Sequence, residues 1–258
     1  MVSRQILLAM LFPAAAAADE ERRTTTIPEP RRAPVKPPRV VITLDYPLAR
    51  EGTDRLAAAV PELLAFFKTQ TGIREPVSWR EESMADPQFA GALLVYLTGN
   101  AADLTASGTT KTRLGQYLKE GGLLFAEDVR PSNLPVWRRR GAGLEGTPFD
   151  RQFKHLMKDP QVLGGTGVDW EPIPKTHPLY DCYFRFSDGP PLSAAPFGTV
   201  TQLEMLQIRG RVGVIFSDLS ITWAWGDPAA GYHTLAMQFG ANLLVFAMTR
   251  QAAGERLR

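Results

Sequence analysis

Acidic side chains follow several apolar runs of the sequence, at the points where buried strands are expected to end. Glu127 and Asp128 come directly after the run 123–126, and Asp45 and Asp218 close two other runs. Paired carboxylates in such a position can hold a divalent cation or act as general acid and base. The structural alternative is that they cap the next element and pair with a nearby arginine. These four residues are therefore candidates for a site, with that alternative left open.

Other residues give weaker signals. Asn100 follows the apolar run 92–97, and His177 precedes a proline, where a turn-forming role is the alternative. Trp223 belongs to a Trp-Ala-Trp-Gly-Asp segment that either offers an aromatic platform for a sugar or peptide, or packs over the sheet edge. Cys182 has no adjacent glycine and no strand-to-helix elbow, so we interpret it as a small buried hydrophobic residue and expect no amidotransferase activity.

Composition excludes several classes of function. The chain has 258 residues, 22% of them charged, with a formal net charge of +2, so no strong field points to nucleic acid. A single cysteine rules out an intramolecular disulfide and a zinc site built from several thiolates. None of the three histidines lies at metal-ligand spacing from another. We expect no metal, no cofactor and no nucleic-acid partner.

The N-terminal segment has the pattern of an export signal. Arg4 supplies a positive charge, residues 6–12 are apolar, and small residues fill 14–18. This apolar run is too short to span a bilayer, so we expect cleavage after residue 18 and no transmembrane span in the mature chain. Residues 19–38 are rich in proline and arginine and predict a disordered linker, and residues 251–258 form a polar tail. The protein is expected in the periplasm or outside the cell.

An α/β domain is expected over residues 39–250. The β-branched run 40–44 predicts a strand, and apolar residues at helical spacing predict a helix over 54–71, which either begins at Pro61 or bends there. The segments 92–97, 110–120 and 123–126 read as strand, helix and strand. Such a crossover is right-handed and makes its two strands parallel, with both carboxyl ends at one edge.

The later part of the domain is less regular. Residues 129–148 form a long loop rich in proline and glycine, and residues 149–157 predict a short amphipathic helix. A last strand is expected at 212–216 and a last helix over 232–248, and its inner face is expected to hold Leu235, Phe239, Leu243 and Phe246. The predicted fold is a three-layer α/β structure, with a mostly parallel sheet and helices on both faces.

Several segments together resemble the bacterial domain-of-unknown-function family numbered 4159, and their order and spacing cover most of residues 40–250. They are Pro61-Glu62-Leu63-Leu64, Thr71-Gly72-Ile73, Tyr96-Leu97-Thr98-Gly99-Asn100, the run 117–128, Phe149-Asp150-Arg151-Gln152-Phe153, His177-Pro178-Leu179-Tyr180 and the run 240–247. The resemblance implies a class I glutamine amidotransferase-like (flavodoxin-like) fold. Architecture alone does not assign a function.

The expected site is a cleft at the carboxyl edge of the sheet, since open parallel sheets bind ligands there. It would be formed by Asp45, Asn100, Glu127, Asp128, His177, Asp218 and Trp223. The first hypothesis for function is a non-catalytic domain that binds a small molecule or an envelope protein. The alternative is a hydrolase or other enzyme acting on carbohydrate, with Glu127 and Asp128 as its carboxylates.

Overall fold

The computed structural model describes residues 39–44, 50–99, 104–129, 148–165, 168–191 and 201–255. All of them lie in one compact unit, residues 36–258. The predicted signal peptide and linker, Asp45, Asn100 and most of the 129–148 loop lie outside the described residues. The predictions made for those segments therefore stay predictions.

One mixed sheet forms the centre of this unit. Its strands are β1 (Arg39–Leu44), β2 (Ser78–Glu81), β3 (Ala92–Gly99), β4 (Leu124–Asp128), β5 (Glu171–Pro172), β6 (Glu204–Ile208) and β7 (Arg211–Ser217). Their order across the sheet is β2, β1, β3, β4, β7, β6, β5. The five strands from β2 to β7 run parallel, and β6 and β5 add an antiparallel margin. The sheet is therefore mostly parallel, as predicted.

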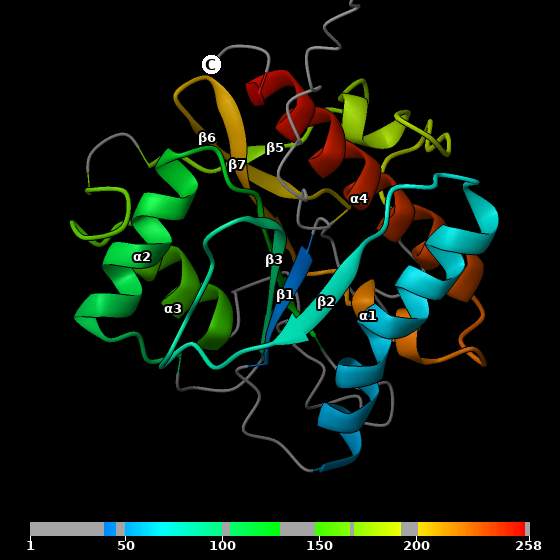
Figure 1. Ribbon diagram of the computed structural model, residues 1–258, viewed down its shortest axis with the longest axis horizontal. Helices are drawn as coiled ribbons and strands as arrows, with labels where there is room; N and C mark the ends of the chain where they lie inside the picture. The colour runs from blue at the N-terminus through cyan, green and yellow to red at the C-terminus, as the bar shows by residue number, and fades with distance from the viewer. Residues whose placement is uncertain are drawn as a thin grey trace, which may run out of the picture. The chain divides into compact units, whose positions relative to one another are not determined.

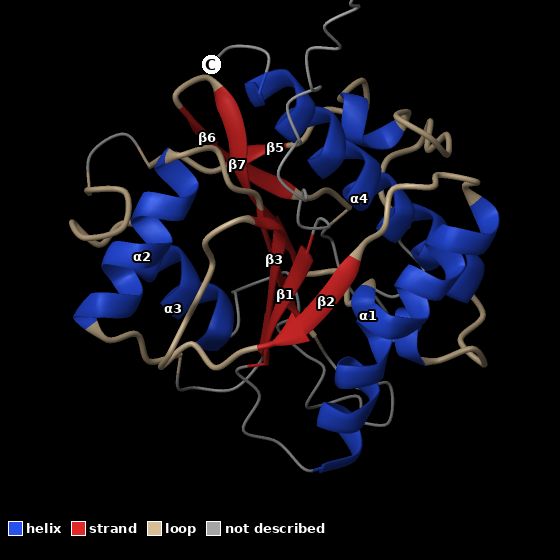
Figure 2. Cartoon of the chain, in the orientation of Figure 1, coloured by secondary structure: helices blue, strands red, loops and turns tan. Residues whose placement is uncertain are grey.

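Helices cover both faces of the sheet (Figures 1 and 2). The helices are α1 (Arg50–Gln70), α2 (Gly108–Lys119), α3 (Pro148–Met157) and α4 (His233–Glu255), with short 3-10 turns η2 (Pro178–Tyr180) and η3 (Thr222–Gly226). Alternate side chains of β3 serve the two sides: Tyr96 packs in the core that contains α1 and α4, and Val95 packs in the core that contains α2 and α3. This two-sided burial explains why β3 and β4 are continuous apolar runs.

The helices on the α1 side pack closely. A Cβ at Gly240 would lie 2.5 Å from a methyl group of Leu63 and 3.0 Å from the Trp225 ring, so only glycine lets α4 approach α1 this closely. α1 contains Pro61 in its interior, so the alternative in which the helix begins at Pro61 is wrong. Upstream of the proline, Leu56 and Ala59 are fully buried, and this packing holds the first turns in place.

The inner face of α4 differs from the prediction at one position. Phe239, Leu243 and Phe246 are buried, but Leu235 is 49% exposed, so its assignment to the inner face is wrong. Ala236 is fully buried in its place, because the helix enters the core one residue later.

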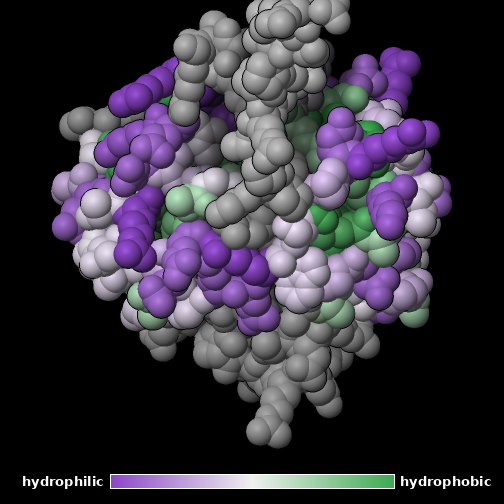
Figure 3. All heavy atoms as spheres, in the orientation of Figure 1, coloured by the Kyte–Doolittle hydropathy of each residue, from purple (hydrophilic) through white to green (hydrophobic). Residues whose placement is uncertain are grey.

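The face of the molecule seen in Figure 3 is largely polar where it is described. In the space-filling view, hydrophilic side chains cover most of it, and apolar residues show only in smaller areas between them (Figure 3). Among the helices of the described residues, none is long and apolar enough to cross a membrane.

Candidate functional site

Glu127 is a buried hydrogen-bond acceptor at the end of β4. Its Oε1 accepts from the Ser217 hydroxyl at 2.6 Å and from the Ile221 backbone N–H at 2.8 Å, and its Oε2 accepts from the Thr222 N–H at 2.7 Å. The side chain is 0% exposed. Its carboxylate therefore holds the segment after β7 and accepts hydrogen bonds at the start of η3. Capping was the structural alternative for Glu127, but the capped element is η3 and not the next element along the chain.

Burial raises the pKa of Glu127 to about 7, although the hydrogen bonds from Ser217 and Thr222 act in the opposite direction. Its neighbour Thr98 donates its hydroxyl to the Glu127 backbone carbonyl at 3.0 Å. The hydrogen bonds from Ser217, Ile221 and Thr222 tie the carboxylate to the turn after β7, and the one from Thr98 holds the backbone of Glu127. Glu127 can reach a substrate only if the turn from Ser217 to Thr222 opens.

A group of acids does form at the carboxyl edge. Burial, followed by the negative charges of Asp128 and Asp150, raises the pKa of Asp218 to about 8. Lys154 offsets part of this charge, since its ammonium lies 3.1 Å from Asp150 and 2.5 Å from Glu204. Thus the structure brings Glu127, Asp128 and Asp218 to one edge, as their strand-end positions indicated.

The other predicted site residues behave differently. Trp223 is 5% exposed and packs with Leu56 and Val129, so it offers no aromatic platform, because η3 folds the indole beneath the surface. Trp225 is 1% exposed and donates its indole N–H to the Ala236 carbonyl at 2.8 Å. Both indoles pack over the sheet edge, which was the alternative for this segment.

His177 lies away from the acids. Its Nδ1 accepts from the Leu179 N–H at 3.2 Å, and its ring meets Phe246 edge-on with 5.4 Å between ring centroids. Phe246 lies 13 residues after the start of α4, roughly 20 Å along the helix axis. His233 binds the Ala224 carbonyl and so places that start beside η3, at the acidic edge. The role of His177 is the turn-forming one.

Cys182 is a partly buried thiol in the turns after η2. It donates to the Asn242 carbonyl at 3.3 Å, and burial raises its pKa to about 11, which disfavours the reactive thiolate. The Asn242 side chain clamps the same segment: its amide donates to the carbonyls of Leu179 at 2.9 Å and Phe184 at 2.7 Å and accepts from the Phe184 N–H at 2.8 Å.

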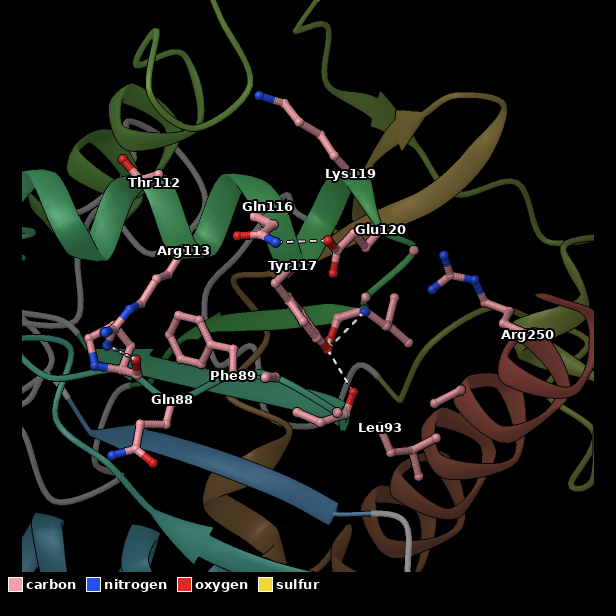
Figure 4. A pocket seen from close by; sticks show the side chains of 18 of the residues that line it. Gln88, Phe89, Leu93, Thr112, Arg113, Gln116, Tyr117, Lys119, Glu120 and Arg250 are labelled. Carbon is pink, nitrogen blue, oxygen red and sulfur yellow. Dashed lines mark hydrogen bonds between the residues drawn. The ribbon is translucent and has the colours of Figure 1, made fainter. Parts of the chain in front are cut away.

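A large cavity lies at the opposite edge of the sheet, where the parallel strands begin. Its volume is about 1360 Å³. β3 contributes Ala92 to its lining, β7 contributes Arg211, α2 contributes Lys119 at its C-terminus, and the last turns of α4 contribute Ala247 and Arg250. Helices of an α/β fold return antiparallel to the strands, so the ends of α2 and α4 meet the strand starts at this edge. Figure 4 shows Arg250 extending from α4 toward the end of α2.

One wall of the cavity is built around Tyr117. Its hydroxyl donates to the Leu123 carbonyl at 2.8 Å and accepts from the Leu123 N–H at 3.0 Å. Its ring occupies the space beside Gly122, where a Cβ would come within 2.3 Å of it. Gly122 is therefore required for the α2 end to close onto β4, and the helix-Gly-Gly-strand pattern has a packing cause.

The charge of the described lining is mainly positive, with five basic and two acidic side chains. The acids have partners within α2 and the loop before β3. Glu120 accepts from the Gln116 amide at 2.9 Å, and Asp86 lies 3.8 Å from the Arg113 guanidinium. In the described part of the chain, Arg211 and Arg250 form no ion pair.

This cavity was not predicted from the sequence, because its lining comes from the loop before β3, from α2, from the β6–β7 turn and from α4. Of its lining, only Gly121 and Gly122 were singled out in the sequence, as the end of the helix. Across the described residues, no group of three or more histidine, cysteine or acidic residues is placed to hold a metal ion.

Two comparisons with known proteins bear on the chain. A family model described as a domain of unknown function (DUF4159) matches residues 41–248. The match spans β3, α2, β4 and β7, which position both the acidic edge and most of the cavity. A comparison with curated proteins gave no match.

Proposed function

The chain belongs to the DUF4159 family of domains of unknown function, and from that premise we propose that it is a non-catalytic domain that binds a small molecule in the cavity at the amino edge of the sheet. One observation carries the proposal. The cavity is large enough for a small-molecule ligand, whereas the carboxylate predicted to do chemistry, Glu127, is fully buried and accepts three hydrogen bonds.

The composition of the lining supports binding. Apolar surface comes from Phe89 and Leu93, and long polar side chains such as Gln88, Gln116 and Gln161 surround it. Apolar walls with a few polar groups that fix orientation are typical of ligand sites. The described lining contains no histidine, cysteine or serine, so it brings together no nucleophile with a histidine base.

A thermal-shift screen of the full chain tests the proposal. Any compound that binds only the folded state raises the melting temperature. Gln116 is exposed on α2 and lines the cavity, so Gln116→Trp obstructs part of the cavity without disturbing the core. His155→Trp is the control, since His155 is exposed on α3 and does not line the cavity.

We expect the selected compounds to raise the melting temperature of the wild type and of His155→Trp, and to lose their effect on Gln116→Trp. Compounds that stabilise all three proteins equally bind elsewhere, and that result refutes the proposed site. Selective stabilisation by a second protein would favour an interaction domain in place of a small-molecule binder.

The second candidate is a carbohydrate-active enzyme at the acidic edge. Asp218 favours it, because its pKa of about 8 keeps a proton available near neutral pH beside the second acid, Asp128. Asp218→Asn distinguishes the two functions, since it removes hydrolysis of any glycoside but leaves binding at the cavity unchanged. Retained glycoside hydrolysis in Asp218→Asn would exclude this assignment of the acid.

We also propose the finer fold and the location. The parallel order β2, β1, β3, β4, β7 corresponds to the flavodoxin-like order, and it supports a class I glutamine amidotransferase-like fold. The N-terminal order of charge, apolar run and small residues supports export with cleavage after residue 18. Intact-mass measurement of the protein from its host tests cleavage, and a retained segment 1–18 on a cytoplasmic protein contradicts it.

A further inference from the structure

Two arginines of the cavity lining, Arg211 and Arg250, form no ion pair with any residue that the structure describes. Arg250 is half-buried on α4, and its Nη1 is a buried donor with no hydrogen-bond partner among the described residues. Burial and the charge of Arg211 lower the pKa of Arg250 to about 10, so the Arg250 guanidinium still carries its charge at pH 7. Like charges that attract no carboxylate are unusual in a folded protein.

The second arginine, Arg211, lies beside a glycine turn. Arg211 begins β7, and its guanidinium lies over Gly121, where a Cβ would stand 2.9 Å from Nη1. Gly121 has a φ of +103°, a conformation that L side chains rarely adopt, so the turn requires glycine. Next to it, Arg209 donates to the Lys119 carbonyl at 3.3 Å. Arg209 and Arg211 therefore lie beside the turn that follows α2, on the rim of the cavity.

We infer that Arg211 and Arg250 form an oxyanion subsite, so that the ligand of this cavity carries a phosphate or carboxylate group. The inference rests on the proposed function and names the ligand class. Guanidinium forks match the oxygens of both groups and form charge-assisted hydrogen bonds with them. An oxyanion between the two arginines would give Arg250 Nη1 an acceptor and relieve the repulsion between the two charges.

The position of the subsite within the cavity also indicates the size of the ligand. Arg250 lies at one end of the cavity, and Gln88 and Arg113 lie toward the other, beside α2 and the loop before β3 (Figure 4). Arg211 lines the cavity as well, and its charge acts on Arg250. The cavity volume of about 1360 Å³ far exceeds that of one phosphate ion. The anionic group is therefore the end of a larger polar molecule, whose remainder contacts the amides.

Titration calorimetry of the full chain at constant ionic strength tests the subsite, with inorganic phosphate and acetate as probes. We expect saturable binding of at least one probe. Phosphate alone indicates a phosphorylated ligand, and acetate alone indicates a carboxylate ligand. In Arg211→Gln and Arg250→Gln the Kd should rise by roughly tenfold or more, since each loses charged hydrogen bonds.

Arg185→Gln is the matched control, because it removes the same charge from an exposed arginine that does not line the cavity. It should bind the probe as the wild type does. Arg211 is exposed, so its variant folds whether or not Arg250→Gln does. Without probe, Arg250→Gln should melt at or above the wild-type temperature, because a partly buried charge and its repulsion with Arg211 are removed.

Absence of saturable binding of either probe to the wild type overturns the subsite, as does unchanged affinity in Arg211→Gln. This failure is distinct from failure of the proposed function. If uncharged compounds still stabilise the wild type and lose their effect on Gln116→Trp, the cavity is a binding site and only the oxyanion inference is wrong.

Discussion

Glu127→Gln separates a structural role of this carboxyl group from a catalytic one. An amide has one oxygen and one NH2 group, so in either orientation the NH2 faces one of the backbone N–H groups of Ile221 and Thr222. One buried donor loses its acceptor, which costs ~2 kcal/mol of the free energy of unfolding. The cost applies wherever Glu127 is neutral in the folded state.

The pH dependence supplies the second part of the expectation. The pKa of Glu127 rises from 4.5 to about 7 on folding, so the folded state holds the proton more tightly and wild-type stability falls as pH increases through this window. The whole pKa difference corresponds to ~3 kcal/mol of the free energy of unfolding. Glutamine does not titrate, so the destabilisation by Glu127→Gln should be largest near pH 5 and should shrink, or reverse, above pH 8.

Urea unfolding of both proteins between pH 4.5 and 8.5, followed by tryptophan fluorescence, measures this difference. The buried indoles of Trp223 and Trp225 report on the turn that Glu127 holds. A stability difference that is the same at every pH would refute the raised pKa. A variant as stable as the wild type at pH 5 would refute the structural role.

Three further outcomes are expected. The pKa of Asp218 is raised from 3.8 to about 8, so wild-type stability should fall as the pH increases between these values, and Asp218→Asn should make this fall smaller. An unchanged pH profile in urea unfolding would contradict the raised pKa. Asn242→Ala should lower the free energy of unfolding by ~3 kcal/mol, because three hydrogen bonds of the Asn242 side chain are lost. Gln238→Ala on the same helix should change the free energy of unfolding by less than ~0.5 kcal/mol. Equal effects of the two substitutions would show that the Asn242 hydrogen bonds are not needed for stability. Cys182, with a thiol pKa of about 11, should react slowly with a thiol probe at pH 7, and fast labelling with a midpoint below that of a free thiol would restore it as a nucleophile.

The parallel part of the sheet was predictable because its signals are local. β3 and β4 are continuous apolar runs, and α2 between them has a Ser107 N-cap and a Gly-Gly stop, so strand, helix and strand could be read in order. β6 was missed, because only two consecutive residues of its five are buried. Its pairing with β7 is a tertiary contact, and a short run of alternating apolar and polar residues does not predict such a contact.

Predictions for the site were less complete for a physical reason. The predicted crossover placed Glu127 and Asp128 at the carboxyl edge, and Asp218 was a candidate only because it ends another apolar run. The sequence does not say that the Ile221 and Thr222 N–H groups return to bind the Glu127 carboxylate. The amino-edge cavity depends on Arg211 and Arg250 meeting across two elements. No spacing in the sequence encodes that encounter, since the folded sheet alone brings the start of β7 beside the end of α4.

The most direct test of the account is a map of backbone amide chemical shifts in the isotopically labelled full chain, titrated with inorganic phosphate and with each compound selected by the screen. We predict that the shifts concentrate at the amino edge, on Leu93, Gly121, Gly122, Arg211 and Ala247, which line the cavity. Shifts that concentrate instead at the carboxyl edge, from Glu127 to Val129 and from Ser217 to Thr222, would contradict the proposed site.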